Sequence, residues 1–201
     1  MFRRGVFVVL VLMFSFMILF VSVAKSATVK YQFSQNSKAT TLLSFRENIP
    51  EVDYFLAYPG KILPDNPLWT LKVIRDRLWL FLTLNPDQKS KLQLLLADKR
   101  LASSKVLFEK GKPELGLSTL DKGEQYLQKA FESSPPSSLS NIALSALKHR
   151  QTIEEIVTIA PEDARPPIIK TLDCSKSVFK DARGKMREIG MLPPENPFKS
   201  E

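Results

Sequence analysis

From residue 67 to residue 190, apolar side chains recur at steps of three and four positions, which is the spacing of one face of an α-helix. Prolines, glycines and Asn or Asp residues interrupt this pattern where helices commonly begin and end. The stretch has none of the alternation of apolar and polar residues that is typical of a β-strand. The pattern predicts five helices, over residues 67–84, 86–110, 113–132, 138–160 and from 164 or 167 to 190.

The loops between the last four predicted helices are short, so consecutive helices should pack as antiparallel neighbours. In the last helix, apolar positions from Ile168 to Ile189 alternate steps of four and three, which is the packing seam of a left-handed bundle. Gly116 and Gly123 weaken the third helix and leave room for a neighbouring helix, so we expect close helix approach there. The predicted fold class is all-α: an antiparallel helical bundle of four to five helices.

The first predicted helix, 67–84, is unusually apolar. Its predicted buried face, from the 3-4 spacing, comprises Leu71, Ile74, Leu78 and Phe81. Two tryptophans add to its apolar surface, and two interpretations are open: core packing, or a groove or membrane-facing surface for a partner. The candidate partner-binding residues are Trp69, Arg75, Trp79 and Phe81.

The first 24 residues differ from the rest. Arg3 and Arg4 precede twenty uncharged residues, and the next charge is Lys25. This layout fits a secretory signal, with small residues that place cleavage after Ala24, although twenty residues also suffice to cross a bilayer. We therefore expect export: either a membrane-anchored extracytoplasmic domain, or a secreted or periplasmic chain if residues 1–24 are cleaved.

Composition divides the remainder of the chain. Residues 25–60 carry Ser, Thr, Gln and Asn without a sustained period and predict a flexible, extended arm. Residues 61–190 form the predicted bundle domain. Residues 191–201 are broken by prolines and predict a disordered tail.

Composition also excludes several classes of function. One His and one Cys rule out an HExxH zinc site, an internal disulfide and a CxxC pair, and no glycine-rich nucleotide loop occurs. The net charge is +8, and removal of residues 1–24 leaves 27 basic and 21 acidic side chains, a net charge of +6. The basic residues are dispersed, so we expect no nucleic-acid partner, and a basic face that suits anionic lipid head groups.

Two single residues remain as candidates for chemistry. His149 could bind a metal or sense pH, but it lies on the inward side of its helix without a second His, which favours a packed, structural role. Cys174 could be a buried small residue or could pair between molecules. We expect that His149, Cys174 and a carboxylate do not converge in a cleft. The sequence therefore predicts no enzymatic activity, no metal and no cofactor.

Several segments resemble one known family. Residues 58–72, YPGKILPDNPLWTLK, are similar to its opening segment, YPGxLPDSPLYxLK, and residues 82–89, LTLNPDQK, fit the LTxxP pattern that follows. Residues 92–101, LQLLLADKRL, resemble LxLxLAExRL, and residues 161–166, PEDARP, resemble a PExARP turn. The family comprises uncharacterised bacterial domains of unknown function, which are helical, exported and often membrane-attached. The resemblance implies such a domain over residues 58–182 and implies no activity; Asn66, Trp69 and Asp98 are conservative departures from its pattern.

Together these features favour a non-enzymatic, extracytoplasmic protein-interaction module of the bacterial cell envelope. It would recognise an envelope protein or another envelope component through a helix face, on the first predicted helix or on the last two. One alternative is an envelope stress chaperone or ligand sensor that binds apolar clients on a helical face. Another is an enzyme that uses Cys174 or His149. The membrane is a further contact if residues 1–24 are retained, and the sequence favours no particular oligomeric state.

Overall fold

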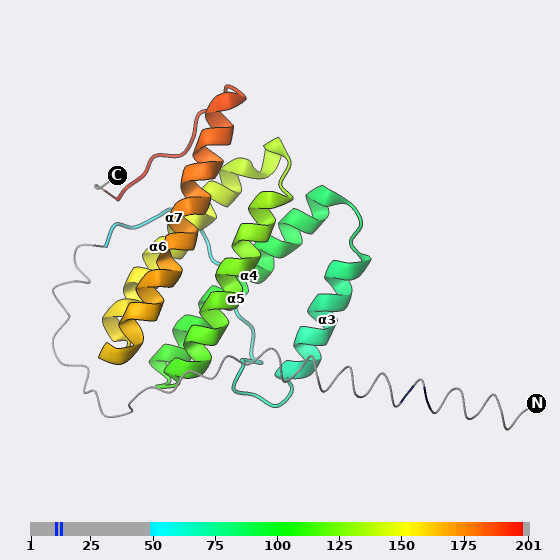
Figure 1. Ribbon diagram of the computed structural model, residues 1–201, viewed down its shortest axis with the longest axis vertical. Helices are drawn as coiled ribbons and strands as arrows, with labels where there is room; N and C mark the ends of the chain where they lie inside the picture. Colours follow the sequence, from blue (N-terminus) through cyan, green and yellow to red (C-terminus); the bar gives the residue numbers. More distant parts are fainter. Residues whose placement is uncertain (1–10, 12, 14–48, 199–201) are drawn as a thin grey trace, which may run out of the picture. The chain divides into compact units, whose positions relative to one another are not determined.

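The computed structural model describes residues 11, 13 and 49–198, and residues 49–198 belong to one compact unit. Within this part of the chain the secondary structure is helical without a β-strand, which confirms the predicted all-α class (Figure 1). The α-helices are α3 (Trp69–Leu82), α4 (Pro86–Glu109), α5 (Pro113–Glu132), α6 (Leu139–Ile159) and α7 (Arg165–Glu188). Short 3-10 helices, Pro136–Ser138 and Glu162–Ala164, precede α6 and α7.

The predicted signal or anchor, residues 1–24, lies outside the described residues except for Val11 and Met13. The predicted arm lies outside them as far as residue 48. None of the helices that the structure describes is both long and apolar enough to cross a bilayer.

The ends of α4 illustrate how local sequence sets the helix boundaries. At the start, Oδ1 of Asn85 accepts the backbone N–H of Asp87 at 2.9 Å, which satisfies one of the free donors of the first turn. At the end, Gly111 adopts a positive φ of 68°, and the N–H of Lys112 donates to the carbonyl of Leu107. This is the Schellman arrangement, in which glycine takes the left-handed position at little cost.

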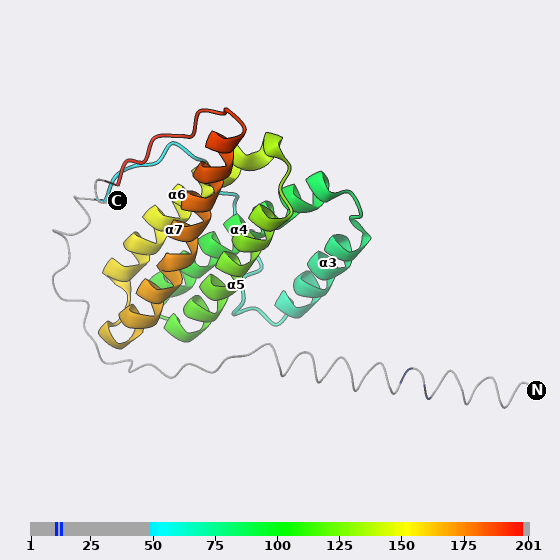
Figure 2. The ribbon, with the colours of Figure 1, turned by 45° about the horizontal axis from the view of Figure 1, so that its top comes forward.

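Helices α4 to α7 form the bundle. Helix α4 packs along α5 and α6 packs along α7, while α5 contacts α7 and α4 contacts α6 (Figure 2). A Cβ atom on Gly123 of α5 would lie 3.2 Å from Cβ of Arg100 and 3.3 Å from the backbone nitrogen of Leu101. The expected close helix approach at a glycine is therefore confirmed. Fully buried core side chains include Leu101, Leu107, Leu117, Leu120, Leu127, Ile142, Ile153, Ile156, Ile168 and Met186.

Irregular segments before and after the helices also pack on the bundle. Val52, in the predicted arm, and Phe198, in the predicted disordered tail, are both buried in the same core cluster. The Phe198 ring lies 4.1 Å from the guanidinium of Arg150. Residues 191–198 thus differ from the prediction, because a large aromatic side chain with a core site and a cationic partner can order a proline-rich segment.

Helix α3 has α4 as its main helical neighbour, and here the predicted burial was wrong. The predicted buried face points to solvent, with exposed fractions of 64% for Leu71, 38% for Ile74, 56% for Leu78 and 79% for Phe81. The buried residue of α3 is Asp76, and Trp69 is half-buried beside α4. Because α3 carries apolar residues on both sides, hydrophobic spacing could not decide its orientation; polar contacts decide it.

Candidate functional site

The inward side of α3 is fixed by Lys72. Its Nζ donates to the backbone carbonyls of Pro59 at 2.8 Å and Ile62 at 3.1 Å. Between them, Gly60 has a φ of 85°, a conformation that side-chain-bearing residues rarely adopt. The segment that leads into α3 is therefore folded back onto the helix by one lysine and one glycine.

Trp69 lies between two cations. Nζ of Lys72 is 4.7 Å and the guanidinium carbon of Arg100 is 4.6 Å from the centroid of the ring. Arg100 belongs to α4 and is buried, so the cation–π contact is shielded from water. Cation–π contacts are strongest when they are shielded in this way. Burial lowers the pKa of Lys72, and the charge of Asp76 opposes this effect. Trp69, one of the predicted partner-binding residues, attaches α3 to α4.

Asp76 and Arg75 form an ion pair at the edge of α3. Nη2 of Arg75 lies 2.6 Å and Nε 3.1 Å from Oδ1 of the buried Asp76. The Arg75 side chain is itself 63% exposed. The pair therefore neutralises the one acidic residue of α3 and keeps the arginine at the border between the inward side and solvent.

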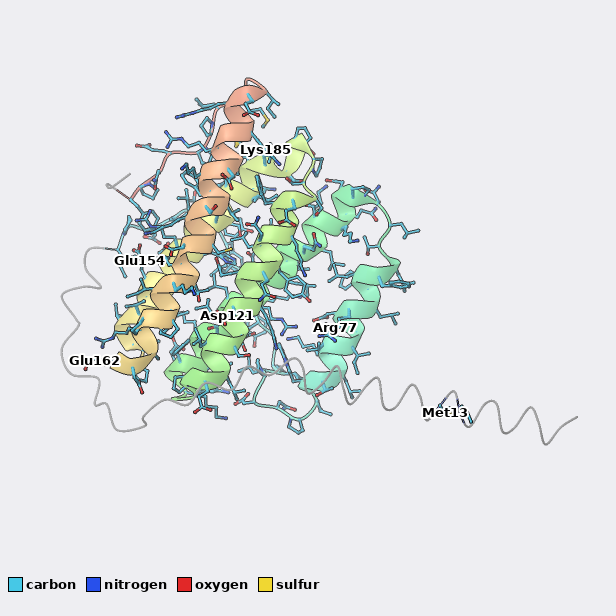
Figure 3. All side chains as sticks on the ribbon, viewed as in Figure 1. Met13, Arg77, Asp121, Glu154, Glu162 and Lys185 are labelled. Carbon is cyan, nitrogen blue, oxygen red and sulfur yellow. The ribbon has the colours of Figure 1, made fainter. Side chains whose placement is uncertain are left out.

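The opposite side of α3 carries five large apolar side chains, which we call the outward face. Its members are Leu71, Ile74, Leu78, Phe81 and Leu82, the last of them 66% exposed. At 100° per residue they occupy an arc of about 100°. Arg75 and Arg77 lie at the two edges of this arc, with Arg77 on the side of α5 (Figure 3). Trp79 is half exposed beyond Arg75. Three of the four predicted partner-binding residues thus lie on the outward face or beside it.

A second cluster of polar groups lies inside the bundle, around the fully buried His149 of α6. Its Nδ1 is 2.5 Å from Oε1 of Glu124 in α5, and its Nε2 is 3.2 Å from Oδ1 of Asp98 in α4. The hydroxyls of Ser145 and Tyr54 each donate to Asp98 at 2.8 Å. One cation therefore joins two buried carboxylates from different helices.

These contacts control the charge of His149. Burial lowers its pKa, but the negative charge of Glu124 and the hydrogen bonds to Asp98 and Glu124 outweigh that effect and raise the pKa from 6.5 to about 9. Burial, together with the charge of Asp98, raises the pKa of Tyr54. At neutral pH the cluster thus holds an imidazolium and a neutral phenol.

Cys174 of α7 lies next to the same cluster, because its thiol donates to the backbone carbonyl of Glu124 at 3.5 Å. Burial raises the pKa of this thiol to about 12, so it is a poor nucleophile at neutral pH. His149, Cys174 and Glu124 thus come together between α5, α6 and α7, where His149 has no exposed surface and Cys174 is half-buried. Among the described residues, no group of His, Cys, Asp and Glu side chains has an arrangement that could hold a metal ion.

Glu124 and Asp98 were not identified from the sequence as members of this cluster. A signal for Glu124 was present: Leu117, Leu120, Glu124 and Leu127 follow one another at steps of three and four on the inward side of α5. A carboxylate at such a position requires a buried partner. The one histidine of the chain was the natural candidate for that partner.

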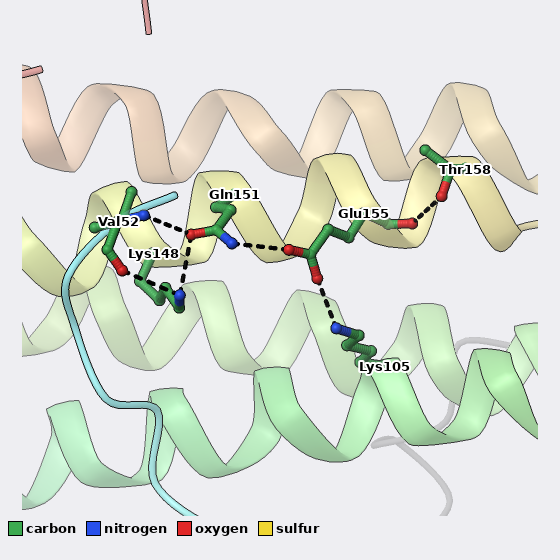
Figure 4. A network of polar contacts seen from close by, with 6 residues as sticks. All are labelled: Val52, Lys105, Lys148, Gln151, Glu155 and Thr158. Carbon is green, nitrogen blue, oxygen red and sulfur yellow. Dashed lines mark hydrogen bonds and ion pairs between the residues drawn. The ribbon is translucent and has the colours of Figure 1, made fainter. Parts of the chain in front are cut away.

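A network of polar contacts connects the segment before α3 to α6 (Figure 4). The N–H of Val52 donates to Oε1 of Gln151 at 2.9 Å, and Nζ of Lys148 donates to the carbonyl of Val52 at 3.1 Å. Gln151 donates in turn to Glu155, which also pairs with Lys105 of α4 at 2.6 Å. Residues 52–54 are therefore held on the bundle by α6 and, through Tyr54, by α4.

The described part of the chain is thus a helical domain with an ordered bundle and one helix that presents an apolar side to solvent. A family model described as a domain of unknown function (DUF5667) matches residues 61–163, and the chain belongs to this family. This agrees with the family resemblance of the sequence. Comparisons with curated proteins and with solved structures gave no match. The matched residues include α3, Asp98, Glu124 and His149.

Proposed function

We propose that this protein is a non-enzymatic interaction module on the extracytoplasmic side of the cell envelope, and that the outward face of α3 is its binding surface. The observation that carries the proposal is the exposure of five large apolar side chains on one helix. Exposed apolar surfaces that are contiguous and bordered by polar residues commonly mark sites of protein or membrane interaction. The cation–π contact between Trp69 and the buried Arg100 of α4 supports it further, because it attaches α3 to the bundle by the side opposite to these side chains.

The charges of α3 define the chemistry of the partner. Arg75 and Arg77 are exposed at the borders of the outward face, whereas the acidic residue of the helix, Asp76, is buried and paired with Arg75. The complementary surface is therefore apolar in its centre and negatively charged at its rim.

A non-enzymatic role is supported by the burial of the titratable cluster. His149 has no exposed surface, and its hydrogen bonds are made to Asp98 and Glu124. A substrate could not approach these groups without opening the bundle.

The chaperone alternative is less well supported, because the apolar side chains lie on the convex side of a single helix rather than along a concave surface that could enclose a client.

The test uses single cysteines in intact cells. In a Cys174→Ser background, Leu78→Cys reports on the outward face, and Ile169→Cys on α7 is a matched control because the two side chains are 56% and 51% exposed. With a membrane-impermeant maleimide we expect labelling at position 169 and several-fold slower labelling at position 78. Equal rates would refute a bound outward face, and absence of labelling at both positions would refute the extracytoplasmic location.

A further inference from the structure

We infer that the occupant of the outward face is the anionic lipid interface of the membrane, with α3 lying in the plane of the head groups. This inference rests on the proposed function and names its partner. The first argument is the shape of the surface. Helix α3 has 14 residues and is about 21 Å long at 1.5 Å per residue. It presents a convex apolar stripe that a soft, deformable interface can accommodate without a preformed groove.

The second argument is the position of the charges. Arg77 lies at one edge of the outward face, and Arg75, which is paired with Asp76, lies at the other. The guanidinium of Arg77 can therefore reach phosphate oxygens while the stripe beside it enters the acyl boundary. Trp79, half exposed beside Arg75, is a side chain that favours this boundary.

The third argument is the chemistry of the stripe. Leu71, Ile74, Leu78, Phe81 and Leu82 offer no hydrogen-bonding side-chain group that could orient one specific protein partner. A second copy of the chain fits poorly as well. In a pair of α3 helices packed face to face, the arginines of both copies would meet along the edges, and the acidic residue of each helix is already buried.

The sequence before the described residues is compatible with this location. An uncharged apolar run ends at Ala24, and the 24 residues from 25 to 48 can span at most roughly 80 Å. If the run is retained in the bilayer, α3 remains within reach of the same membrane, and docking becomes an intramolecular event that is favoured by a high effective concentration.

The test places an environment-sensitive NBD dye on the full chain in vesicles. The dye is attached to Leu78→Cys, or to Ile169→Cys as control, each in a Cys174→Ser background. Vesicles contain phosphatidylcholine with or without phosphatidylglycerol, together with a nitroxide-labelled lipid as quencher. We expect strong quenching at position 78 in the anionic vesicles and little at position 169. Absence of quenching at position 78, or equal quenching at both positions, would overturn the assignment.

Two variants probe the two components of the surface. Leu71→Ser with Phe81→Ser removes exposed apolar side chains and should abolish quenching at position 78 while the circular dichroism spectrum stays unchanged. Arg77→Gln should lower the docking equilibrium about fivefold in anionic vesicles and leave it unchanged in neutral ones. Equal effects of Arg77→Gln in both vesicles would contradict the role of lipid charge.

The two proposals fail in different ways. If position 78 is protected in cells but is not quenched by nitroxide lipid in vesicles, the outward face binds a protein; the proposed function then stands and the lipid assignment falls. A blue shift of the dye without quenching indicates a second copy of the chain and also overturns the lipid assignment. If position 78 is unprotected in cells, the proposed function itself is refuted.

Discussion

Raising the pH from 6 to 8.5 should destabilise the folded domain through one residue, His149. In the folded state its imidazolium lies between Glu124 and Asp98, and its pKa is about 9 rather than 6.5. The folded state therefore binds this proton more tightly than the unfolded chain does. The resulting stabilisation is fully present below the unfolded pKa and is lost as the pH rises through the folded pKa.

The size of the effect follows from the two pKa values. A difference of 2.5 pH units between folded and unfolded states corresponds to about 3.4 kcal/mol of stabilisation at low pH. Deprotonation in the folded state is incomplete at pH 8.5, so the expected loss in the free energy of unfolding between pH 6 and pH 8.5 is about 2 kcal/mol. This is a large part of the stability of an ordinary domain.

The assay is urea unfolding of the chain without residues 1–24, followed by far-ultraviolet circular dichroism across this pH range. His149 is the one histidine of the chain, so no other imidazole contributes. The Cys174→Ser background removes a thiol whose folded pKa of about 12 lies above its ordinary value and would also lower stability at alkaline pH.

The matched control is the double variant Glu124→Gln, His149→Gln. It keeps side chains of similar size, removes the buried cation and one of its carboxylates, and should have a stability that does not change between pH 6 and pH 8.5. His149→Gln alone should be less stable than the double variant, because it leaves two buried carboxylates without a cation. A wild-type stability that stays flat across this range would mean that the pKa of His149 is the same in the folded and unfolded states, and a stability that rises would mean that His149 is neutral in the folded state; either result would refute the reasoning.

Further changes should alter stability in the same urea assay. Gly123→Ala should cost about 1–3 kcal/mol because its Cβ would crowd α4. Gly184→Ala, on the open side of α7, should stabilise the domain by about 0.5–1 kcal/mol. If both variants changed the stability in the same direction, the close approach of α5 and α4 would be contradicted. Asn85→Ala should cost about 1 kcal/mol because the N-cap of α4 is lost, and an unchanged urea midpoint would argue against a stabilising cap. Leu78→Ser should cost less than about 0.5 kcal/mol, against about 3 kcal/mol for the buried Leu101→Ala; similar losses would mean that α3 is turned inward.

The helix boundaries could be predicted because they depend on local chemistry. Asn85 followed by proline starts α4, and Gly111 ends it, through hydrogen bonds within a few residues of each other. The His149 cluster could be predicted only in part. Its members come from α4, α5, α6 and the segment before α3, and their meeting depends on how the helices pack. The inward position of Glu124 indicated that a buried partner was needed, but not which one.

The orientation of α3 could not be predicted from hydrophobic spacing, and the reason bears on function. A helix that is apolar on both sides would normally bury the side with more aliphatic residues. Here Lys72, Asp76 and Trp69 occupy the other side: Trp69 lies against the buried Arg100 of α4, Lys72 donates to two carbonyls of the preceding segment, and Asp76 is buried. These contacts keep the aliphatic side in solvent against the hydrophobic effect. The isolated domain therefore carries the free-energy cost of exposing these apolar side chains to water, and a bound partner that covers them can offset this cost. We therefore propose that the outward face is half of an interface rather than a packing defect, and the labelling rates at positions 78 and 169 distinguish the two.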